Sequence, residues 1–459
     1  MQNIVVFDIG KTNAKVLLID LATGDEVTAL KRPNTVLTDG PYPHFDAEGL
    51  WAFLLDGLRQ LAARHRIDAI SITTHGAAGA LVDAAGGLAL PILDYEFTGP
   101  DRLASDYDAL RPSFTETGAP RLPMGLNLGA QLYWQARTHP GAFARARHIL
   151  MYPQYWSMRL TGVAVSEPTS LGCHTDLWDP WRADFSTMVT RLGWRSLFPK
   201  VRPASAMLGP ILPEIAKATG LPPDTPVLSG IHDSNASLVP YLGDAGPRAV
   251  LSTGTWMIVM ALGAEKLPLD SKRDVLVNVN ANGAPTPTAR YMAGREFDEI
   301  TGGGMATPGA ADEAAVLAGQ IMALPSLHPG TGPFPGLTFG WIPAEPPTDA
   351  QRVAAASFYT ALMGAECLRL IGAAGPVIIE GPFGGNASFA RMLATATGRC
   401  VIAAGASAGT GLGAALLAGP VLAKRPVVKP VLPETGAMWL AYVAKWRAEV
   451  GQRWSADFS

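Results

Sequence analysis

The hydrophobic positions at the start of the chain fall into short apolar runs separated by a polar turn. Asn3–Phe7 and Val16–Ile19 are rich in β-branched and aromatic residues, which is typical of strands. Between them, Asp8–Asn13 combines charged and hydroxyl residues with Gly10. The pattern predicts a β-hairpin, and Val27–Leu30 is predicted to be a third strand.

A second apolar–polar–apolar stretch of the same kind occurs in the other half of the chain. Ala249–Leu251 and Trp256–Val259 are predicted strands, and Ser252–Thr255 is the turn between them. Backbone N–H groups in glycine turns can form an anion site. Two such hairpins therefore suggest one anion held between two lobes. Glycine is also routine at the tips of ordinary hairpins, so a purely structural role stays open.

Helical periodicity alternates with these strand patterns. Apolar residues recur every three or four positions from Leu50 to Leu61, which predicts an amphipathic helix, and Ala69–Thr73 is a predicted buried strand. Asn127–Leu160 is predicted to be mostly helical. The alternation continues in the second half and predicts an α/β fold with two domains, residues 1–243 and 244–459, joined at the Gly/Pro-rich segment Leu242–Pro247.

Length and composition fit this organisation. The 459 residues exceed what one core usually serves, and 48% hydrophobic with 16% charged residues indicates a well-buried globular protein. A net charge of −3 argues against a nucleic-acid partner. Three distant cysteines form neither a disulfide framework nor a metal spacing. With no secretory pattern at the N-terminus, a cytoplasmic location is expected.

One segment is long and uncharged enough to raise the question of a membrane span. Cys400–Ala423 carries no charge, but it is rich in Gly and Ala and includes Pro420. A buried strand–turn–helix is the preferred prediction, and no membrane partner is expected.

Several catalytic motifs are excluded by their spacing. Lys11-Thr12 ends like a P-loop, but that motif needs glycine at the position of Val5. Gly405–Gly409 spells a nucleophile elbow, yet the last histidine, His328, precedes its serine. No dinucleotide-binding glycine fingerprint follows a strand, and the eight histidines show no zinc-site spacing.

What remains is a set of small turns that each follow a predicted strand. They contain Asp8, His75, Asp233, Thr253 and Gly384. Ligands of open α/β sheets bind at the carboxyl ends of strands. Two carboxylates with glycine/threonine turns suit phosphoryl transfer, in which a protein positions and neutralises more than it reacts covalently.

These turns resemble the FGGY family of carbohydrate kinases, in the actin–Hsp70–hexokinase fold superfamily, over nearly the whole chain. The matching motifs, in order, are Asp8–Lys15, Gly230–Ser234, Leu251–Trp256, Gly384–Gly398 and Gly409–Ala415. Each motif alone is weak, and the five in this order are specific. The resemblance implies two ribonuclease-H-like domains flanking a central cleft, with ATP and Mg²⁺ as cofactors.

The same resemblance implies roles for individual residues. Asp233 would be the general base that takes the proton of the sugar hydroxyl, and an N-cap role is compatible with this. Asp8 would hold Mg²⁺. Lys11 would add a phosphate contact or simply face solvent. The implied nucleotide-binding residues are Gly10, Lys11, Thr12, Asn13, Lys15, Thr253, Gly254, Thr255, Gly384, Gly385 and Asn386.

On the sugar side the resemblance implies contacts by His75, Gly76, Glu96 and Asn127, together with Asp233. His75 could equally be a core histidine. The turn Asp94–Phe97 departs from the family pattern.

The motifs around Asp233 and Thr253 resemble the rhamnulokinase and fuculokinase branch, whereas His75 resembles xylulokinases. A ketose kinase of L-fuculose or L-rhamnulose type is favoured. Alternatives are a xylulose, ribulose or polyol kinase, a non-catalytic nucleotide- or sugar-responsive protein, and an Hsp70-like ATPase. A homodimer is a further expectation.

Overall fold

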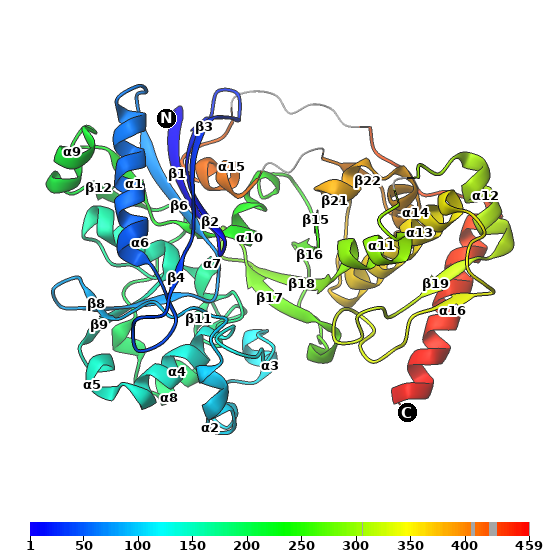
Figure 1. Cartoon of the computed structure of the whole chain (residues 1–459), viewed down its shortest axis with the longest axis horizontal. Coiled ribbons are helices and arrows are strands. Elements are labelled where there is room, and N and C mark those ends of the chain that lie inside the picture. The colour runs from blue at the N-terminus through cyan, green and yellow to red at the C-terminus, as the bar shows by residue number, and fades with distance from the viewer. Residues whose placement is uncertain (305, 405–408, 422–428, 459) are drawn as a thin grey trace. The chain divides into compact units, whose positions relative to one another are not determined.

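The computed structural model describes residues 1–304, 306–404, 409–421 and 429–458, which form two compact units (Figure 1). Unit 1 contains Met1–Asp244, Val277–Pro285 and the described residues of Ala408–Arg425, and unit 2 contains the described residues of Ala245–Leu276, Thr286–Ser407 and Pro426–Ser459. Within the described residues, no helix is both long and apolar enough to cross a membrane.

Unit 1 is built on one mixed sheet. Strands β1 (Asn3–Ile9), β2 (Asn13–Asp20) and β3 (Asp25–Pro33) form an antiparallel meander, which confirms the predicted hairpin and third strand. Strand β6 (Ala69–Thr74) runs parallel to β1, and β13 (Pro226–Leu228) runs parallel to β6. The edge strand β12 (Met207–Pro210) completes the order β12-β13-β6-β1-β2-β3.

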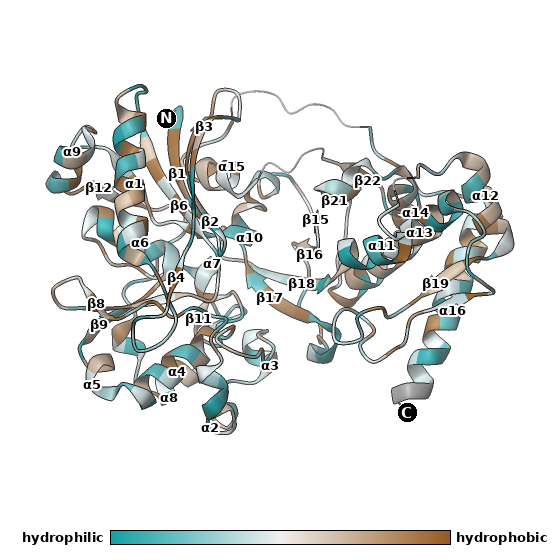
Figure 2. Cartoon of the chain, in the orientation of Figure 1, coloured by the Kyte–Doolittle hydropathy of each residue, from teal (hydrophilic) through white to brown (hydrophobic). Residues whose placement is uncertain are grey.

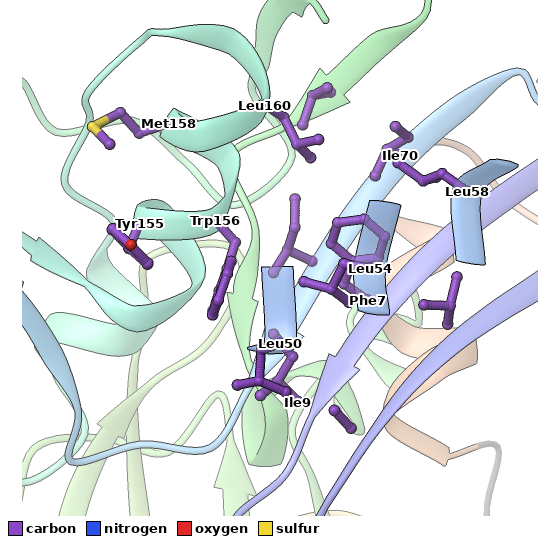
Figure 3. Close-up of a cluster of buried hydrophobic side chains, with 14 of the residues drawn as sticks. Phe7, Ile9, Leu50, Leu54, Leu58, Ile70, Tyr155, Trp156, Met158 and Leu160 are labelled. Atoms are coloured by element: carbon purple, nitrogen blue, oxygen red, sulfur yellow. The ribbon is translucent and has the colours of Figure 1, made fainter. Parts of the chain in front are cut away.

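The main core of unit 1 lies between this sheet and two helices. Helix α1 (Ala47–Ala62) begins where the Asp46 carboxylate accepts the Gly49 N–H at 2.8 Å. Its buried face carries Leu50, Leu54 and Leu58 toward Phe7 and Ile70 of the sheet and toward α6 (Tyr152–Thr161), as Figure 3 shows. Burying each such side chain contributes about 1.5–3 kcal/mol. In Figure 2 the strands β1 and β6 are correspondingly brown.

A second, smaller sheet in unit 1 adds a strand to a segment that is otherwise helical. Asn127–Leu160 is mostly helical, as predicted, but β9 (Ala146–Met151), which was not predicted, separates α5 (Pro140–Phe143) from α6. Strand β9 pairs with β7 (Gly79–Asp83), which also pairs with β8 (Leu88–Leu90). A partner strand whose paired residues are 63 to 72 positions away in the sequence decides this conformation, and local periodicity does not record it.

The sheet of unit 2 repeats the arrangement of the first. Strands β15 (Arg248–Thr253), β16 (Met257–Leu262) and β18 (Pro285–Tyr291) are successively antiparallel. Strand β21 (Val377–Glu380) runs parallel to β15, and β22 (Val401–Ala403) runs parallel to β21. The strand order in this sheet is β17-β18-β16-β15-β21-β22, with β17 (Val275–Val279) at one edge. The predicted α/β class is confirmed in both units.

Helix α15 (Gly409–Leu416) comes late in the chain but packs on the sheet of unit 1. The Ser71 hydroxyl of β6 donates to the Ala414 carbonyl at 2.8 Å. A Cβ on Gly413 would lie 1.8 Å from the Ala236 carbonyl oxygen, so only glycine allows this helix to approach α10 (Asp233–Ala236). The predicted strand–turn–helix of Cys400–Ala423 thus has β22 and α15 as its strand and helix. Residues 405–408 of the rejected nucleophile elbow lie outside the described residues.

The remaining elements are short connections in unit 1 and covering helices in unit 2. In unit 1 these are β4 (Val36–Leu37), β5 (His44–Phe45), η1 (Gly99–Leu103), α2 (Ala104–Asp108), α3 (Phe114–Thr117), α4 (Leu128–Thr138), α7 (Pro168–Leu171), β10 (Trp178–Asp179), β11 (Asp184–Phe185), α8 (Thr187–Arg191), η2 (Arg195–Leu197), α9 (Pro213–Thr219), β14 (Ile231–His232) and η3 (Val239–Tyr241). In unit 2 they are η4 (Ser271–Arg273), α11 (Ala293–Thr301), α12 (Ala310–Gly319), β19 (Met322–Leu324), β20 (Gly340–Ile342), α13 (Asp349–Leu370), η5 (Pro382–Gly385), α14 (Ala387–Thr397) and α16 (Ala437–Phe458).

Candidate active site

Three parallel strands of unit 1 end side by side, and each leads into one of the turns singled out in the sequence. Strand β6 lies between β1 and β14, so that Thr73 pairs with both Asp8 and Ile231. The His75 N–H then donates to the Ile9 carbonyl at 2.9 Å. Because the carboxyl ends of parallel strands share one edge of the sheet, the turns of Asp8, His75 and Asp233 converge there.

Asp233 is the first residue of α10 and directly follows the N-cap residue His232, so it lies near the N-cap as predicted but is not itself the capping residue. The Asp233 Oδ1 atom accepts from the Ser234 N–H at 2.6 Å and from the Ser234 hydroxyl at 3.3 Å. His232 Nε2 lies 3.2 Å from the same oxygen. Within the described chain, these interactions of the carboxylate all end on Oδ1, so Oδ2 keeps its full capacity to accept.

The surroundings of Asp233 favour its neutral form. Although 28% of the side-chain surface is open to solvent, the enclosing protein raises its pKa by burial. The His75 side chain and the Ser234 hydrogen bonds lower the pKa, and the nearby Asp8 charge raises it. The net result is a carboxylate whose pKa lies above the ordinary aspartate value and closer to neutral pH, as a general base requires.

His232 is held in one tautomer by its neighbours. The Asn235 amide donates to Nδ1 at 3.0 Å, so the proton of the neutral ring is on Nε2. Burial lowers the pKa of His232 to about 4, which keeps the ring neutral near pH 7. Nε2 can therefore donate to Asp233 Oδ1, and it also lies 3.3 Å from Cys173 Sγ.

The backbone around His232 is tied down as well. Its N–H donates to the Thr169 hydroxyl oxygen at 3.1 Å, and that hydroxyl donates to Glu167 at 2.6 Å. A Cβ on Gly76 would lie 2.9 Å from His232 Nε2, so glycine is required there by close approach. Sequence reasoning missed Cys173, Thr169 and Glu167, because they lie in an irregular segment with no motif.

His75 presents a buried acceptor. Its Nδ1–H donates to the Gly76 carbonyl at 2.8 Å, which leaves Nε2 with a lone pair. Nε2 is buried and has no hydrogen-bond partner among the described residues. Burial lowers the pKa of His75, so the ring is neutral. Leaving such a polar atom unsatisfied costs about 1–3 kcal/mol, which a ligand hydroxyl would recover.

The hairpin β1–β2 carries two lysines that pair with different carboxylates. Asp8 and Lys15 are opposite each other in the strand register, and Lys15 Nζ lies 3.1 Å from Asp8 Oδ2. The Lys11 ammonium contacts Asp94 and lies 3.3 Å from Glu96 Oε2. Only 21% of the Lys11 side chain is exposed, so the expectation that it simply faces solvent is wrong.

A magnesium ion is compatible with Asp8, although the described residues contain no group of three or more His, Cys, Asp or Glu arranged for a metal. Mg²⁺ is commonly held by one or two carboxylates, with phosphate oxygens and water completing its shell. Asp8 is a largely buried carboxylate at a strand end, and Lys15 orients it. This donor set fits a phosphate-bound Mg²⁺ and not a closed protein site.

Three other predicted residues in unit 1 have distinct positions. Thr12 is exposed at the tip of the hairpin, and the Gly10 N–H is used within the turn, donating to the Asn13 carbonyl at 2.8 Å. Asn127 is fully buried: its Oδ1 accepts from the Leu122 N–H and its Nδ2 donates to the carbonyls of Pro120 and His174. The Asn127 amide thus holds loops together, and a sugar contact would have to break one of these bonds.

The turn of β15–β16 in unit 2 has no charged residue from Ser252 to Trp256, and in it Thr255 is exposed and Thr253 is buried. The Thr253 hydroxyl donates to the Glu380 carbonyl and accepts from the Phe383 N–H at 3.2 Å. The Gly254 N–H donates to the Trp256 carbonyl at 2.9 Å. A Cβ on Gly294 would lie 2.2 Å from the Gly254 carbonyl oxygen, so α11 begins directly against this turn.

The predicted adenosine residues lie where η5 meets α14. Asn386 caps α14 by accepting the Phe389 N–H at 2.9 Å, and its Nδ2 donates to the Ser357 hydroxyl at 2.9 Å. The Gly384 N–H donates to the Gly381 carbonyl at 3.0 Å, whereas Gly385 is exposed with open space where a Cβ would be.

Comparison with known proteins identifies the family. Residues 3–240 match the N-terminal domain of the FGGY family of carbohydrate kinases, and residues 245–426 match the C-terminal domain of carbohydrate kinase FGGY. The chain belongs to the FGGY family of carbohydrate kinases. The family predicted from the five motifs is confirmed.

Among curated proteins, L-fuculokinase of Escherichia coli (strain K12) is 27% identical over 277 residues, 57% of this chain and 57% of the relative. Rhamnulokinase of Pectobacterium atrosepticum is 26% identical over 313 residues, 64% of this chain and 59% of the relative. The matched segment thus spans a little over half the length of these relatives.

Solved structures match over nearly the whole chain. A carbohydrate kinase from Novosphingobium aromaticivorans is 40% identical, with 98% of this chain and 99% of that chain covered and a TM-score of 0.90. Xylulose kinase from Rhodospirillum rubrum has a TM-score of 0.77 at 19% identity, with coverage of 98% and 99%, and shows the fold alone. The predicted fold class is confirmed by these matches.

Proposed function

We propose that this FGGY protein is an ATP- and Mg²⁺-dependent ketose kinase that transfers the γ-phosphate of ATP to a sugar hydroxyl. Residues 1–243 would supply the sugar site, the first phosphate turn and the general base. Residues 244–459 would supply the second phosphate turn and the adenosine site. The observation that carries the proposal is the state of Asp233: a carboxylate of raised pKa with one oxygen saturated by donors and the other open.

In this proposal Asp233 Oδ2 accepts the proton of the attacking hydroxyl. The Ser234 donors and His232 Nε2–H hold Oδ1, so the carboxylate cannot rotate without losing them. Its raised pKa makes it a stronger base than an exposed aspartate while it stays ionised near neutral pH. The hydroxyl oxygen then forms its bond to the γ-phosphorus as the bond to the β-phosphate oxygen breaks.

Asp8 would hold the Mg²⁺, and when bound the ion neutralises phosphate charge. Lys15 keeps the Asp8 carboxylate in place between metal-binding events and would contact phosphate. Thr12 and Thr255, the exposed hydroxyls of the two hairpin tips, are proposed phosphate contacts, and Gly10, Asn13 and Gly254 shape those tips. Thr253 would act indirectly, by fixing the Gly381–Gly385 turn. Gly384, Gly385 and Asn386 would form the adenosine side.

His75 is the proposed first sugar contact, because its buried Nε2 lacks a donor within the described chain. A sugar hydroxyl would donate to it, with Gly76 keeping the backbone close to His232. L-fuculose or L-rhamnulose is favoured by the motifs around Asp233 and Thr253 and by the names of the curated relatives. Xylulose, ribulose and polyols remain the alternatives. A cytoplasmic location and a homodimer belong to the same proposal, and light scattering would test the dimer.

The first experiment is coupled ADP release with L-fuculose, L-rhamnulose, D-xylulose, D-ribulose and glycerol. We expect a ketose to stimulate ADP release and Asp233→Asn to lower this turnover by about 10²–10⁴-fold. The melting temperature and ATP binding of the variant should be unchanged. Near-wild-type turnover in Asp233→Asn would contradict its role as base.

Two outcomes of the same assay would favour the other classes. ADP release that no sugar stimulates indicates an Hsp70-like ATPase. Binding of sugar or nucleotide with no ADP release indicates a non-catalytic responsive protein.

A further inference from the structure

The Asp94–Phe97 turn, which departs from the family pattern, is joined by ion pairs to Lys11 of the hairpin β1–β2. Lys11 precedes the exposed tip of the phosphate hairpin by one residue, yet its ammonium contacts Asp94 and lies 3.3 Å from Glu96. Lys15, four residues later, pairs with Asp8 instead. The two lysines of this hairpin therefore form ion pairs with different carboxylates.

Lys11 and the proposed sugar contact His75 share the same two aromatic rings. The Lys11 Nζ atom lies 4.8 Å from the Tyr95 ring centre and 5.2 Å from that of Phe45. The His75 ring centre lies 5.5 Å from Tyr95 and 5.0 Å from Phe45. The Lys11 charge also lowers the pKa of His75. An ammonium donor and an unsatisfied imidazole acceptor thus border one aromatic surface.

The turn that carries Asp94 is anchored on both sides. The Asp94 N–H donates to the Pro43 carbonyl at 3.0 Å, and the Gly125 N–H donates to the Tyr95 carbonyl at 2.9 Å. The Asp94 side chain is 8% exposed. A mostly buried charge that is held in this way is preorganised, so ligand binding loses little conformational entropy in ordering it.

We propose that the Lys11–Asp94 pair determines acceptor specificity: it offers a fixed donor beside the His75 acceptor to neighbouring hydroxyls of an uncharged ketose. This inference rests on the proposed function. The Lys11 ammonium has three N–H donors, so it can keep both carboxylates and still donate to a hydroxyl oxygen. Tyr95, which is partly exposed, supplies an apolar face for the sugar carbons.

The local charge also excludes a class of acceptor. Four carboxylates, Asp8, Asp94, Glu96 and Asp233, accompany two ammonium groups, Lys11 and Lys15. Because Lys11 is already neutralised, a sugar acid would bring another negative charge to a site with an excess of them. The substrate class is therefore a neutral polyhydroxy ketone and not an aldonate.

The test compares Lys11→Met and Asp94→Asn with Lys217→Met, an exposed lysine of α9. Methionine keeps the apolar stem of Lys11 over the two rings and removes the charge. We expect both site variants to raise the KM for L-fuculose at least tenfold and to change the KM for ATP less than twofold. The double variant should raise the KM for L-fuculose no more than the more severe of the two single variants does, because the two groups act as a unit. Lys217→Met should change neither constant.

D-gluconate serves as the anionic probe. In the wild type, kcat/KM for D-gluconate should be at least 100-fold lower than kcat/KM for L-fuculose. In Asp94→Asn, the ratio of kcat/KM for L-fuculose to that for D-gluconate should be at least tenfold smaller than in the wild type. A rise in the KM for ATP with an unchanged KM for the sugar would make Lys11 a phosphate contact and overturn the inference. A wild-type preference for D-gluconate would overturn it too.

Failure of the proposed function remains distinguishable. If no sugar yields ADP, that function fails, and titration calorimetry of L-fuculose without ATP still decides the role of Lys11. Weaker binding to Lys11→Met than to wild type supports it. Equal affinity, or no binding to either protein, overturns it.

Discussion

The hairpins β1–β2 and β15–β16 are the same construction made from different chemistry. Each is an antiparallel pair within its sheet, and each has a parallel strand beside its first member, β6 in unit 1 and β21 in unit 2. Each turn also contains a glycine whose N–H donates to a carbonyl within the turn. The backbone scaffold is therefore repeated.

The side chains of the two hairpins differ in charge. The first places Asp8, Lys11 and Lys15 around its turn, all three in ion pairs. The second has Ser252, Thr253 and Thr255 at the matching end, and Thr253 is engaged by backbone groups of the β21 turn. In the proposed function the first hairpin would therefore bind the metal and distinguish charged from neutral ligands, whereas the second would supply shape and neutral hydrogen bonds.

The largest effect is expected when the carboxylate at the end of β1 is replaced by an amide. Asp8 is the next-to-last residue of β1, and Ser252 is the next-to-last residue of β15. We expect Asp8→Asn to weaken the apparent Mg²⁺ affinity about 10- to 100-fold in an ADP-release titration, because a metal ligand is lost. Ser252→Ala should change it less than threefold. If the two variants changed the apparent Mg²⁺ affinity equally, the carboxylate of the first hairpin would not be the group that binds the metal.

A smaller effect is expected in the pH dependence. The base must be ionised, and burial raises the pKa of Asp233, so kcat/KM for the sugar should fall as pH drops, with its midpoint above the ordinary aspartate value of about 4. Ser234→Ala removes a hydroxyl that donates to the ionised form. The acid limb of the kcat/KM profile of Ser234→Ala should therefore move to higher pH, by a few tenths of a pH unit.

Ser237→Ala is the matched control for this shift. The Ser237 hydroxyl donates to the Ser234 carbonyl at 2.8 Å, in the same helical turn, and makes no contact with the carboxylate that the structure describes. Its acid limb should coincide with that of the wild type. A midpoint at or below about pH 4 in the wild type would contradict the enclosed environment of Asp233.

The fold could be predicted from local pattern wherever that pattern matched the tertiary role. The apolar runs of strands β1 and β2 and the three/four-residue repeat of α1 both lie where the sequence indicated. Strand β9 could not be predicted, because its conformation depends on pairing with β7. The packing of α15 on unit 1 is likewise a property of close glycine contacts, which the motif at Gly409–Ala415 does not reveal by itself.

The candidate site was predictable as a set of turns but not as a network. Asp8 lies at the end of β1, His75 and Asp233 directly follow β6 and β14, and the strand order brings the three together. The partners that set their chemistry come from elsewhere: Cys173 and Asn235 lie against His232, and Asp94 holds Lys11. A single sequence contains the residue types but not the pairings, which depend on loops without a periodic signal.

The last test concerns the glycine at the second tip. A Cβ on Gly254 would have only the Trp256 carbonyl oxygen nearby, at 3.9 Å, whereas one on Gly10 would lie 3.2 Å from the Asn13 carbonyl oxygen. The protein itself therefore tolerates Gly254→Ala, and any loss must come from a ligand that approaches the backbone. We expect the KM for ATP to rise about fivefold, which corresponds to about 1 kcal/mol. The melting temperature should match that of Gly141→Ala, an exposed α5 position with open space for a Cβ. An unchanged KM for ATP in Gly254→Ala would mean that nucleotide phosphates do not approach this turn closely, and the likeness of the two hairpins would then be one of architecture alone.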